Sequence, residues 1–257
     1  MEQEYNELAE DRKDLEEFLQ LQPTKVREDC KIVSHVDVGQ AFMLRIDKKP
    51  PEAFIPNMPK SAMPSENTNT PRITCAPTLV GCMVGYFRIE DDARDGSLPL
   101  PNGTAKFLGG YSISVLPFKH CLKPGKEMVV DTDTSDEHWL VPYSMDSVEV
   151  EPDVVGKMFI DELTYLPQTG KRPSERLVML LCIDKDIEIQ LMPGKRVGKG
   201  TYRFTIFWPS IRERSVQDQN SLVSIEPISL EEFLKLKKAK ADLLSYKDRL
   251  PGFSAWK

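Results

Sequence analysis

The sequence has no apolar run approaching the roughly 18 residues that a bilayer-spanning helix needs, so no membrane partner is expected. It also shows no apolar or arginine-rich leader, because its first 17 residues, MEQEYNELAEDRKDLEE, are acidic and polar. Apolar residues nevertheless make up 40% of the 257 residues, which is enough for a hydrophobic core and excludes a disordered chain. These features predict a folded cytoplasmic protein.

The chain also lacks the basic excess of a protein that wraps duplex nucleic acid. Residues 1–30 contain ten acidic and four basic residues, so their formal charge of −6 equals that of the whole chain. The remaining residues are neutral overall. We therefore expect no nucleic-acid partner, apart from a local basic patch at Lys195, Arg196, Lys199 and Arg203.

Metal-binding and disulfide patterns are absent as well. The five cysteines are Cys30, Cys75, Cys82, Cys121 and Cys182. Their number is odd and no pair forms C-x-x-C, so we expect reduced, mostly buried thiols. The three histidines, His35, His120 and His138, have no H-x-x-x-H spacing, and no metal site is predicted.

Both ends of the chain are predicted to be amphipathic helices. The first spans Glu2–Gln22 and ends at Pro23; its apolar stripe consists of Leu8, Leu15, Phe18 and Leu19. The second spans Ser229–Arg249, with Ser229 and Glu232 forming a capping box. A single terminal helix cannot bury its own stripe, so each helix must dock on its own domain or on a partner. Contacts between protein subunits, and hence an oligomer, are therefore expected.

Between these helices, short apolar runs separated by proline and glycine predict strands. The predicted strands are 31–36, 41–46, 72–75, 110–117, 137–141, 156–166, 176–183, 187–192 and 201–208. A proline-rich loop is expected at 50–71, a short helix after Pro77 and a second loop at 90–105. The predicted fold is α+β with a mostly antiparallel β core. We expect three segments: an N-terminal helix at 1–30, an α+β domain at 31–160 and a β-rich extension at 161–257.

The glycine-rich segment PGKRVGKG invites comparison with a phosphate-binding loop. Only three residues separate Gly194 from Gly198, and Lys199 precedes a glycine instead of a serine or threonine, so the spacing does not match. We expect a hairpin turn that joins strands 187–192 and 201–208.

The strand after this turn has apolar side chains on one face, and basic residues lie nearby in the sequence. The apolar residues are Tyr202, Phe204, Ile206 and Trp208; the further basic residues are Arg212 and Arg214. Two interpretations remain: a surface on which unpaired bases stack, or one core face with charged loops. The second is favoured.

Three motifs occur in order along the first half of the chain: IVSHV (32–36), NTPRITCAPTLVGCMVGY (69–86) and DEHWLVPYS (136–144). Together they resemble small ADP-ribosyltransferase-like proteins of phages and bacteria. The resemblance covers about residues 31–160, and its middle motif is the most specific. It implies an ADP-ribosyltransferase-like fold for this part of the chain, with the histidine on the first strand.

The resemblance also implies roles for individual residues. His35 would hydrogen-bond the adenosine-side ribose of NAD, and Thr74 or Thr78 would line the nicotinamide pocket. Glu137 would hold the nicotinamide ribose and stabilise the positive charge that develops on the sugar. Arg72 would either contribute to cofactor binding or anchor the proline-rich loop. The alternatives are a solvated acid at a strand start for Glu137 and a half-buried strand histidine for His35.

The chain departs from this family at two positions. Val36 follows His35 where active relatives tend to have a small pair such as Gly-Thr, and Ser135 stands where a second glutamate would be. The first hypothesis is therefore an interaction or structural protein on a degenerate fold, acting through protein–protein contacts. A phage gene, with the protein in the host cytoplasm or the virion, fits this hypothesis. The alternative is an active NAD-dependent ADP-ribosyltransferase that uses His35, a threonine hydroxyl and Glu137.

Overall fold

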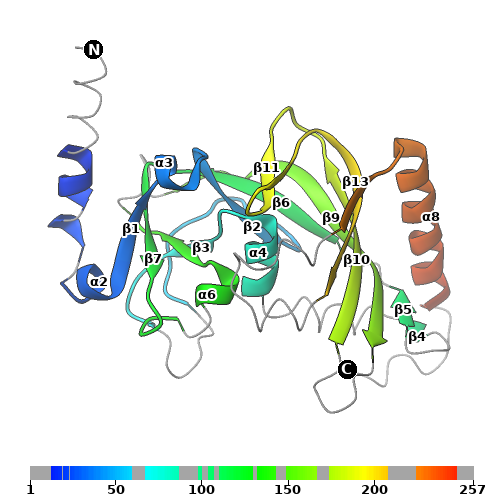
Figure 1. Cartoon of the computed structure of the whole chain (residues 1–257), viewed down its shortest axis with the longest axis horizontal. Helices are drawn as coiled ribbons and strands as arrows, with labels where there is room; N and C mark the ends of the chain where they lie inside the picture. The colour runs from blue at the N-terminus through cyan, green and yellow to red at the C-terminus, as the bar shows by residue number, and fades with distance from the viewer. Residues whose placement is uncertain are drawn as a thin grey trace. The chain divides into compact units, whose positions relative to one another are not determined.

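The protein is described by a computed structural model (Figure 1). The described residues are 13–18, 20–22, 24–59, 67–86, 98–99, 104–106, 110–129, 132–142, 149–166, 174–207 and 224–247. They form a mixed α+β structure with mostly antiparallel sheets, which confirms the predicted fold class at this coarse level. None of the described helices is both long and apolar enough to cross a membrane.

The chain divides into two compact units. Unit 1 contains Met1–Arg45, Pro51–Gly85 and Val115–Asp153; unit 2 contains Ile46–Pro50, Tyr86–Ser114 and Val154–Lys257. Residues 31–160 thus contribute to both units. The predicted division into three segments stays a prediction.

A four-stranded antiparallel sheet organises unit 1. Its order is β1 (Cys30–Ser34), β7 (His120–Pro124), β8 (His138–Leu140) and β3 (Ile73–Cys75). Trp139 of β8 lies opposite Leu122 on one side and Thr74 on the other. Strands β2 (Phe42–Asp47) and β6 (Gly110–Pro117) have residues in both units.

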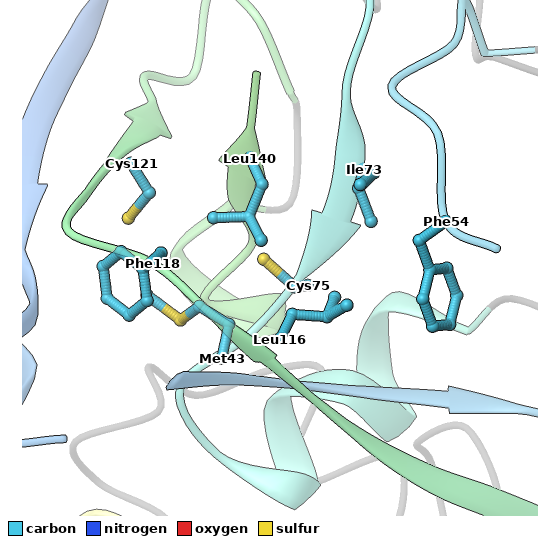
Figure 2. Packing of buried hydrophobic residues seen from close by; sticks show 8 residues of the cluster. All are labelled: Met43, Phe54, Ile73, Cys75, Leu116, Phe118, Cys121 and Leu140. Carbon is cyan, nitrogen blue, oxygen red and sulfur yellow. The ribbon is translucent and has the colours of Figure 1, made fainter. Parts of the chain in front are cut away.

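Both faces of this sheet are covered by apolar side chains, because successive strand residues point to opposite faces. One cluster consists of Met43, Phe54, Ile73, Cys75, Leu116, Phe118, Cys121 and Leu140 (Figure 2). The other consists of Phe18, Val26, Leu122, Met128, Val129, Trp139 and Val141. Neighbouring residues such as Trp139 and Leu140 therefore belong to different clusters.

Short helices complete unit 1. They are α2 (Thr24–Asp29), α3 (His35–Val38), α4 (Leu79–Gly85) and α6 (Thr132–Ser135). Helix α4 is packed closely against α6: a Cβ atom added to Gly81 would lie 2.8 Å from the carbonyl oxygen of Ser135. The predicted N-terminal helix is helical at residues 13–18 and 20–21, and Phe18 lies in the second cluster. Leu8 and Leu19 lie outside the described residues.

Unit 2 is built on an antiparallel sheet. Along its path the order is β14 (Ser224–Pro227), β13 (Gly200–Phe207), β10 (Ser174–Ile183), β9 (Asp153–Leu166), β5 (Thr104–Lys106) and β4 (Leu98–Pro99). From Met158 onward the buried residues of β9 are Met158, Ile160 and then Leu163, so the alternation slips by one residue. A register shift opposite Val178 and Met179 explains this slip, because a β-bulge inserts one unpaired residue.

Helix α8 (Leu230–Lys247) packs on this sheet through Phe233. The ring centroid of Phe233 lies 6.0 Å from that of Phe159 in an edge-to-face arrangement. The helix begins as the capping pattern predicts, with the Glu232 amide donating to Ser229 Oγ over 3.1 Å.

Three local predictions need correction. The hairpin partner of β11 (Ile189–Met192) is β12 (Lys195–Val197), not 201–208, because Gly194 at φ +76° closes a tight turn. Strand β13 pairs with β10 and β14 instead. The first strand ends at Ser34, so His35 begins α3, and the expected loop 90–105 contains β4 and the start of β5.

Candidate functional site

All five residues that the resemblance singles out lie in unit 1, at two places. Arg72, Thr74 and Glu137 gather around Trp139 where β3 pairs with β8, and Thr78 follows at the start of α4. His35 follows β1, at the opposite edge of the four-stranded sheet. Gln40 connects His35 to the start of α4: its backbone amide donates to the carbonyl oxygen of His35 over 3.2 Å, and its Nε2 donates to the carbonyl oxygen of Pro77, the residue before Thr78, over 2.8 Å.

Arg72 is almost completely buried, with 3% of its surface exposed. Its guanidinium carbon lies 4.0 Å from the centroid of the Trp139 ring, and its Nη1 donates to the carbonyl oxygen of Asn67 over 2.7 Å. The same Nη1 lies 3.4 Å from the carbonyl oxygen of Thr70. These contacts support the loop-anchoring alternative, because the charged group is used to hold the loop that precedes β3.

The two candidate threonines both have structural partners. Thr78 is 1% exposed, and its Oγ1 accepts a 3.0 Å hydrogen bond from the amide of Gly81, so it caps α4. Thr74 is half-buried, and its Oγ1 accepts a 3.2 Å hydrogen bond from Arg45. Arg45 Nη1 also donates to the carbonyl oxygen of Thr74 over 2.8 Å.

Glu137 is half-buried next to the start of β8. Its Oε1 accepts a 2.6 Å hydrogen bond from Nε1 of Trp139, whose side chain is completely buried. A buried indole N–H needs an acceptor, and a carboxylate is a strong one. Glu137 is thus part of the packing of Trp139, not the solvated acid that was the alternative prediction.

His35 differs from the other four candidates. Its amide donates to the carbonyl oxygen of Lys119 over 3.0 Å, but its buried Nδ1 has no hydrogen-bond partner among the described residues. Nearby in the chain, Gln40 donates through Nε2 to the carbonyl oxygen of Pro77 over 2.8 Å, and its Oε1 is likewise unpartnered there. His35 is therefore not the satisfied strand histidine of the alternative prediction.

The side chain of His138 is a buried polar group beside Glu137 that the sequence motifs did not indicate. His138 Nδ1 lies 2.8 Å from the carbonyl oxygen of Asp136, so this nitrogen donates, and the Asp136 carboxylate pairs with Lys123 at 2.5 Å. Burial lowers the pKa of His138, although the charge of Asp136 acts in the opposite direction. A second pair, Ser34 Oγ and His120 Nδ1, lies 2.8 Å apart across β1 and β7. The tertiary structure brings Ser34 and His120 together, which are 86 residues apart in the sequence.

The described cysteines and acids form no metal site. All five cysteines are free thiols, and no group of three or more histidine, cysteine or acidic residues in the described parts of the chain could hold a metal ion. Burial raises the pKa of Cys30 to about 11, and it also raises the pKa of Cys75 and of Cys121 above the ordinary value.

The predicted basic patch is partly neutralised by neighbouring acids. Arg203 lies 3.5 Å from Glu232, and Arg196 lies 3.8 Å from Glu188. Phe204 and Ile206 are completely buried, which confirms the core-face interpretation for these two residues of β13. Trp208, Arg212 and Arg214 lie outside the described residues.

Comparison with protein-family models, curated proteins and solved structures gave no match. The likeness to ADP-ribosyltransferase-like proteins therefore depends on the three sequence motifs alone.

Proposed function

We propose that the protein is a non-catalytic interaction protein, built on a degenerate ADP-ribosyltransferase-like fold over residues 31–160. The main support for the proposal is the hydrogen bond between Glu137 and Trp139. Glu137 is the only candidate catalytic carboxylate, and this bond makes it the partner of a buried side chain. The burial of Arg72 and the capping role of Thr78 add support.

In this proposal the protein acts through contacts with other protein subunits at its terminal helices. Helix α8 leaves Leu230 and Leu234 exposed, and Leu21 is exposed near the other end of the chain. A source in phages or bacteria, with the protein in the host cytoplasm or in a virion, belongs to the same proposal.

Calorimetry with millimolar NAD and the intact chain tests this proposal. We expect no heat of binding and no nicotinamide release. Glu137→Gln should lower the free energy of unfolding by about 1 kcal/mol, because Trp139 would lose a charged acceptor. Glu52→Gln, which changes an exposed acid of the same unit, should leave it unchanged.

The second candidate function is NAD-dependent ADP-ribosyl transfer, and the buried, unpartnered Nδ1 of His35 favours it. A ribose hydroxyl would satisfy this nitrogen. In that case NAD binds, His35→Ala weakens the binding, and Glu137→Gln slows turnover on the order of 10²–10³-fold without loss of affinity. Turnover of this kind would contradict the non-catalytic proposal.

A further inference from the structure

The hydroxyl of Ser34 and the imidazole of His120 form a close polar pair in unit 1. Ser34 Oγ lies 2.8 Å from His120 Nδ1, and the two residues stand directly opposite each other where β1 pairs with β7. The amide of the next residue, His35, donates to the carbonyl oxygen of Lys119 over 3.0 Å. Hydrogen-bonded and non-hydrogen-bonded pairs alternate in an antiparallel ladder, so Ser34 and His120 form a non-hydrogen-bonded pair, in which side chains lie closer together.

The imidazole of His120 is held in place by packing. His120 is almost completely buried, and its ring centroid lies 5.9 Å from that of Phe18 at an interplanar angle of 45°. A general base acts best when it is already within hydrogen-bond reach of the proton that it takes up. His120 is therefore positioned to accept the hydroxyl proton of Ser34 at Nδ1.

The turn that contains Ser34 gives a reagent access to its hydroxyl. Ser34 is the last residue of β1 and is only half-buried, and Val36 and Asp37 of the following α3 are exposed. The amide of Ser34 donates to Oδ2 of Asp37 over 2.8 Å, so this carboxylate is fixed beside the pair. Its negative charge stabilises the imidazolium that forms when His120 takes up a proton.

Ser229 occupies a similar position without a histidine. It precedes α8, and its Oγ accepts a hydrogen bond from the amide of Glu232 over 3.1 Å. Within the described part of the chain, no histidine hydrogen-bonds to Ser229. Ser229 is also exposed, whereas Ser34 is half-buried. Solvent access alone thus favours reaction at Ser229, and a neighbouring base favours reaction at Ser34.

We propose that Ser34 is an activated nucleophile that accepts an acyl group from an activated ester or thioester. Ser34 Oγ forms a bond to the carbonyl carbon, and the bond from that carbon to the leaving oxygen or sulfur breaks. The hydroxyl proton passes to His120 Nδ1 and then to the leaving group, so the products are an ester of Ser34 and an alcohol or thiol. This inference goes beyond the proposed interaction function, because the step needs neither NAD nor Glu137.

Covalent labelling of the folded full-length chain with a fluorophosphonate tests the inference. Ser34 Oγ displaces fluoride from phosphorus and leaves a stable adduct, while its proton passes to His120. Mass spectrometry of proteolytic peptides should show that Ser34 of the wild type is labelled at least about tenfold faster than Ser229. His120→Gln can still hydrogen-bond to the hydroxyl but is not a base, so it should slow the labelling of Ser34 at least about tenfold.

A second probe, 4-nitrophenyl acetate, tests acyl transfer itself. The wild type should release nitrophenolate in a fast phase that coincides with acetylation of the peptide containing Ser34. Ser34→Ala should abolish the fast phase. Ser229→Ala is the matched control at the other serine that precedes a helix, and it should leave this phase unchanged.

Equal labelling of Ser34 and Ser229 in the wild type would overturn the inference, and this comparison does not depend on the folding of any variant. So would an unchanged rate at Ser34 in a His120→Gln protein whose urea unfolding shows that it is folded. Either result leaves the proposed interaction function standing, because that proposal is tested with NAD. Continuous release of nitrophenolate that requires Ser34 would support the nucleophile and contradict the non-catalytic proposal.

Discussion

Trp139 connects residues that lie far apart in the sequence. Its ring contacts the Arg72 guanidinium on one side, and its indole N–H donates to Glu137. Its neighbours in the second cluster include Phe18, Leu122 and Met128. A residue that resembles a catalytic acid in a motif thus has a structural role, because the folded chain places a buried donor beside it.

Replacing Arg72 by lysine should destabilise the protein although the charge is kept. Lysine cannot reproduce the planar contact with Trp139 or the geometry of the guanidinium hydrogen bond to the carbonyl of Asn67. We expect a loss of about 2 kcal/mol in the free energy of unfolding, measured with urea. Arg27→Lys, at an exposed arginine of the same unit that bonds Thr24, should cost less than about 0.5 kcal/mol. Equal effects of the two changes would contradict the anchoring role of Arg72.

His138 should make the stability depend on pH in the mildly acidic range. Burial lowers its pKa below the ordinary value of about 6.5, so the folded state binds its proton less readily than the unfolded state. The unfolded chain therefore takes up the proton first as pH falls. Stability is fully present above pH about 6.5 and decreases below it, by at most about 1.4 kcal/mol per pH unit for one group.

Denaturation at a series of pH values from about 7.5 to about 5 measures this dependence. His138→Gln should flatten the profile between pH about 6.5 and about 5.5, where few carboxylates titrate. An unchanged slope in His138→Gln would show that another group is responsible.

Among the elements, α4 contains residues that pack well but have low helix propensity. Its segment LVGCMVG contains two glycines and two valines, which are poor helix formers, yet Leu79–Val84 are all buried. The apolar spacing after Pro77 correctly predicted a helix here. The spacing does not reveal which glycine is required by a neighbouring element.

Gly81→Ala should therefore destabilise the protein, although alanine is the better helix former. The added Cβ would lie 2.8 Å from the carbonyl oxygen of Ser135 and 2.9 Å from Oγ1 of Thr78, so α4 and α6 would have to move apart. We expect a loss of about 1–3 kcal/mol in thermal or urea unfolding.

Gly85→Ala is the matched control in the same helix, because its Cβ would approach nothing closer than the Cβ of Ser135 at 3.9 Å. This change should be neutral or stabilise by up to about 1 kcal/mol. A Gly81→Ala protein that is as stable as the Gly85→Ala protein would contradict the close packing of α4 against α6.

The strands show which elements can be predicted from local pattern. The prediction for 110–117 matches β6, and those for 156–166 and 176–183 lie within β9 and β10. Strand β7 was missed, because it is central in its sheet: four of its five residues are buried, and HCLKP shows no polar–apolar alternation. The partner of β11 was predicted wrongly, because Gly194 closes a tight turn directly after this strand and β13 pairs with β10 and β14 instead.

For the molecule as a whole, the sequence by itself determined the α+β class, the positions of strands such as β6, β9 and β10, and the charge concentrated in residues 1–30. These properties follow from composition and short-range periodicity, which each segment carries on its own. Only the tertiary structure decided the order β1, β7, β8, β3 and the contact of the Arg72 guanidinium with the Trp139 ring. Such features depend on residues distant in the sequence that meet only when the core is packed, so no local pattern could predict them.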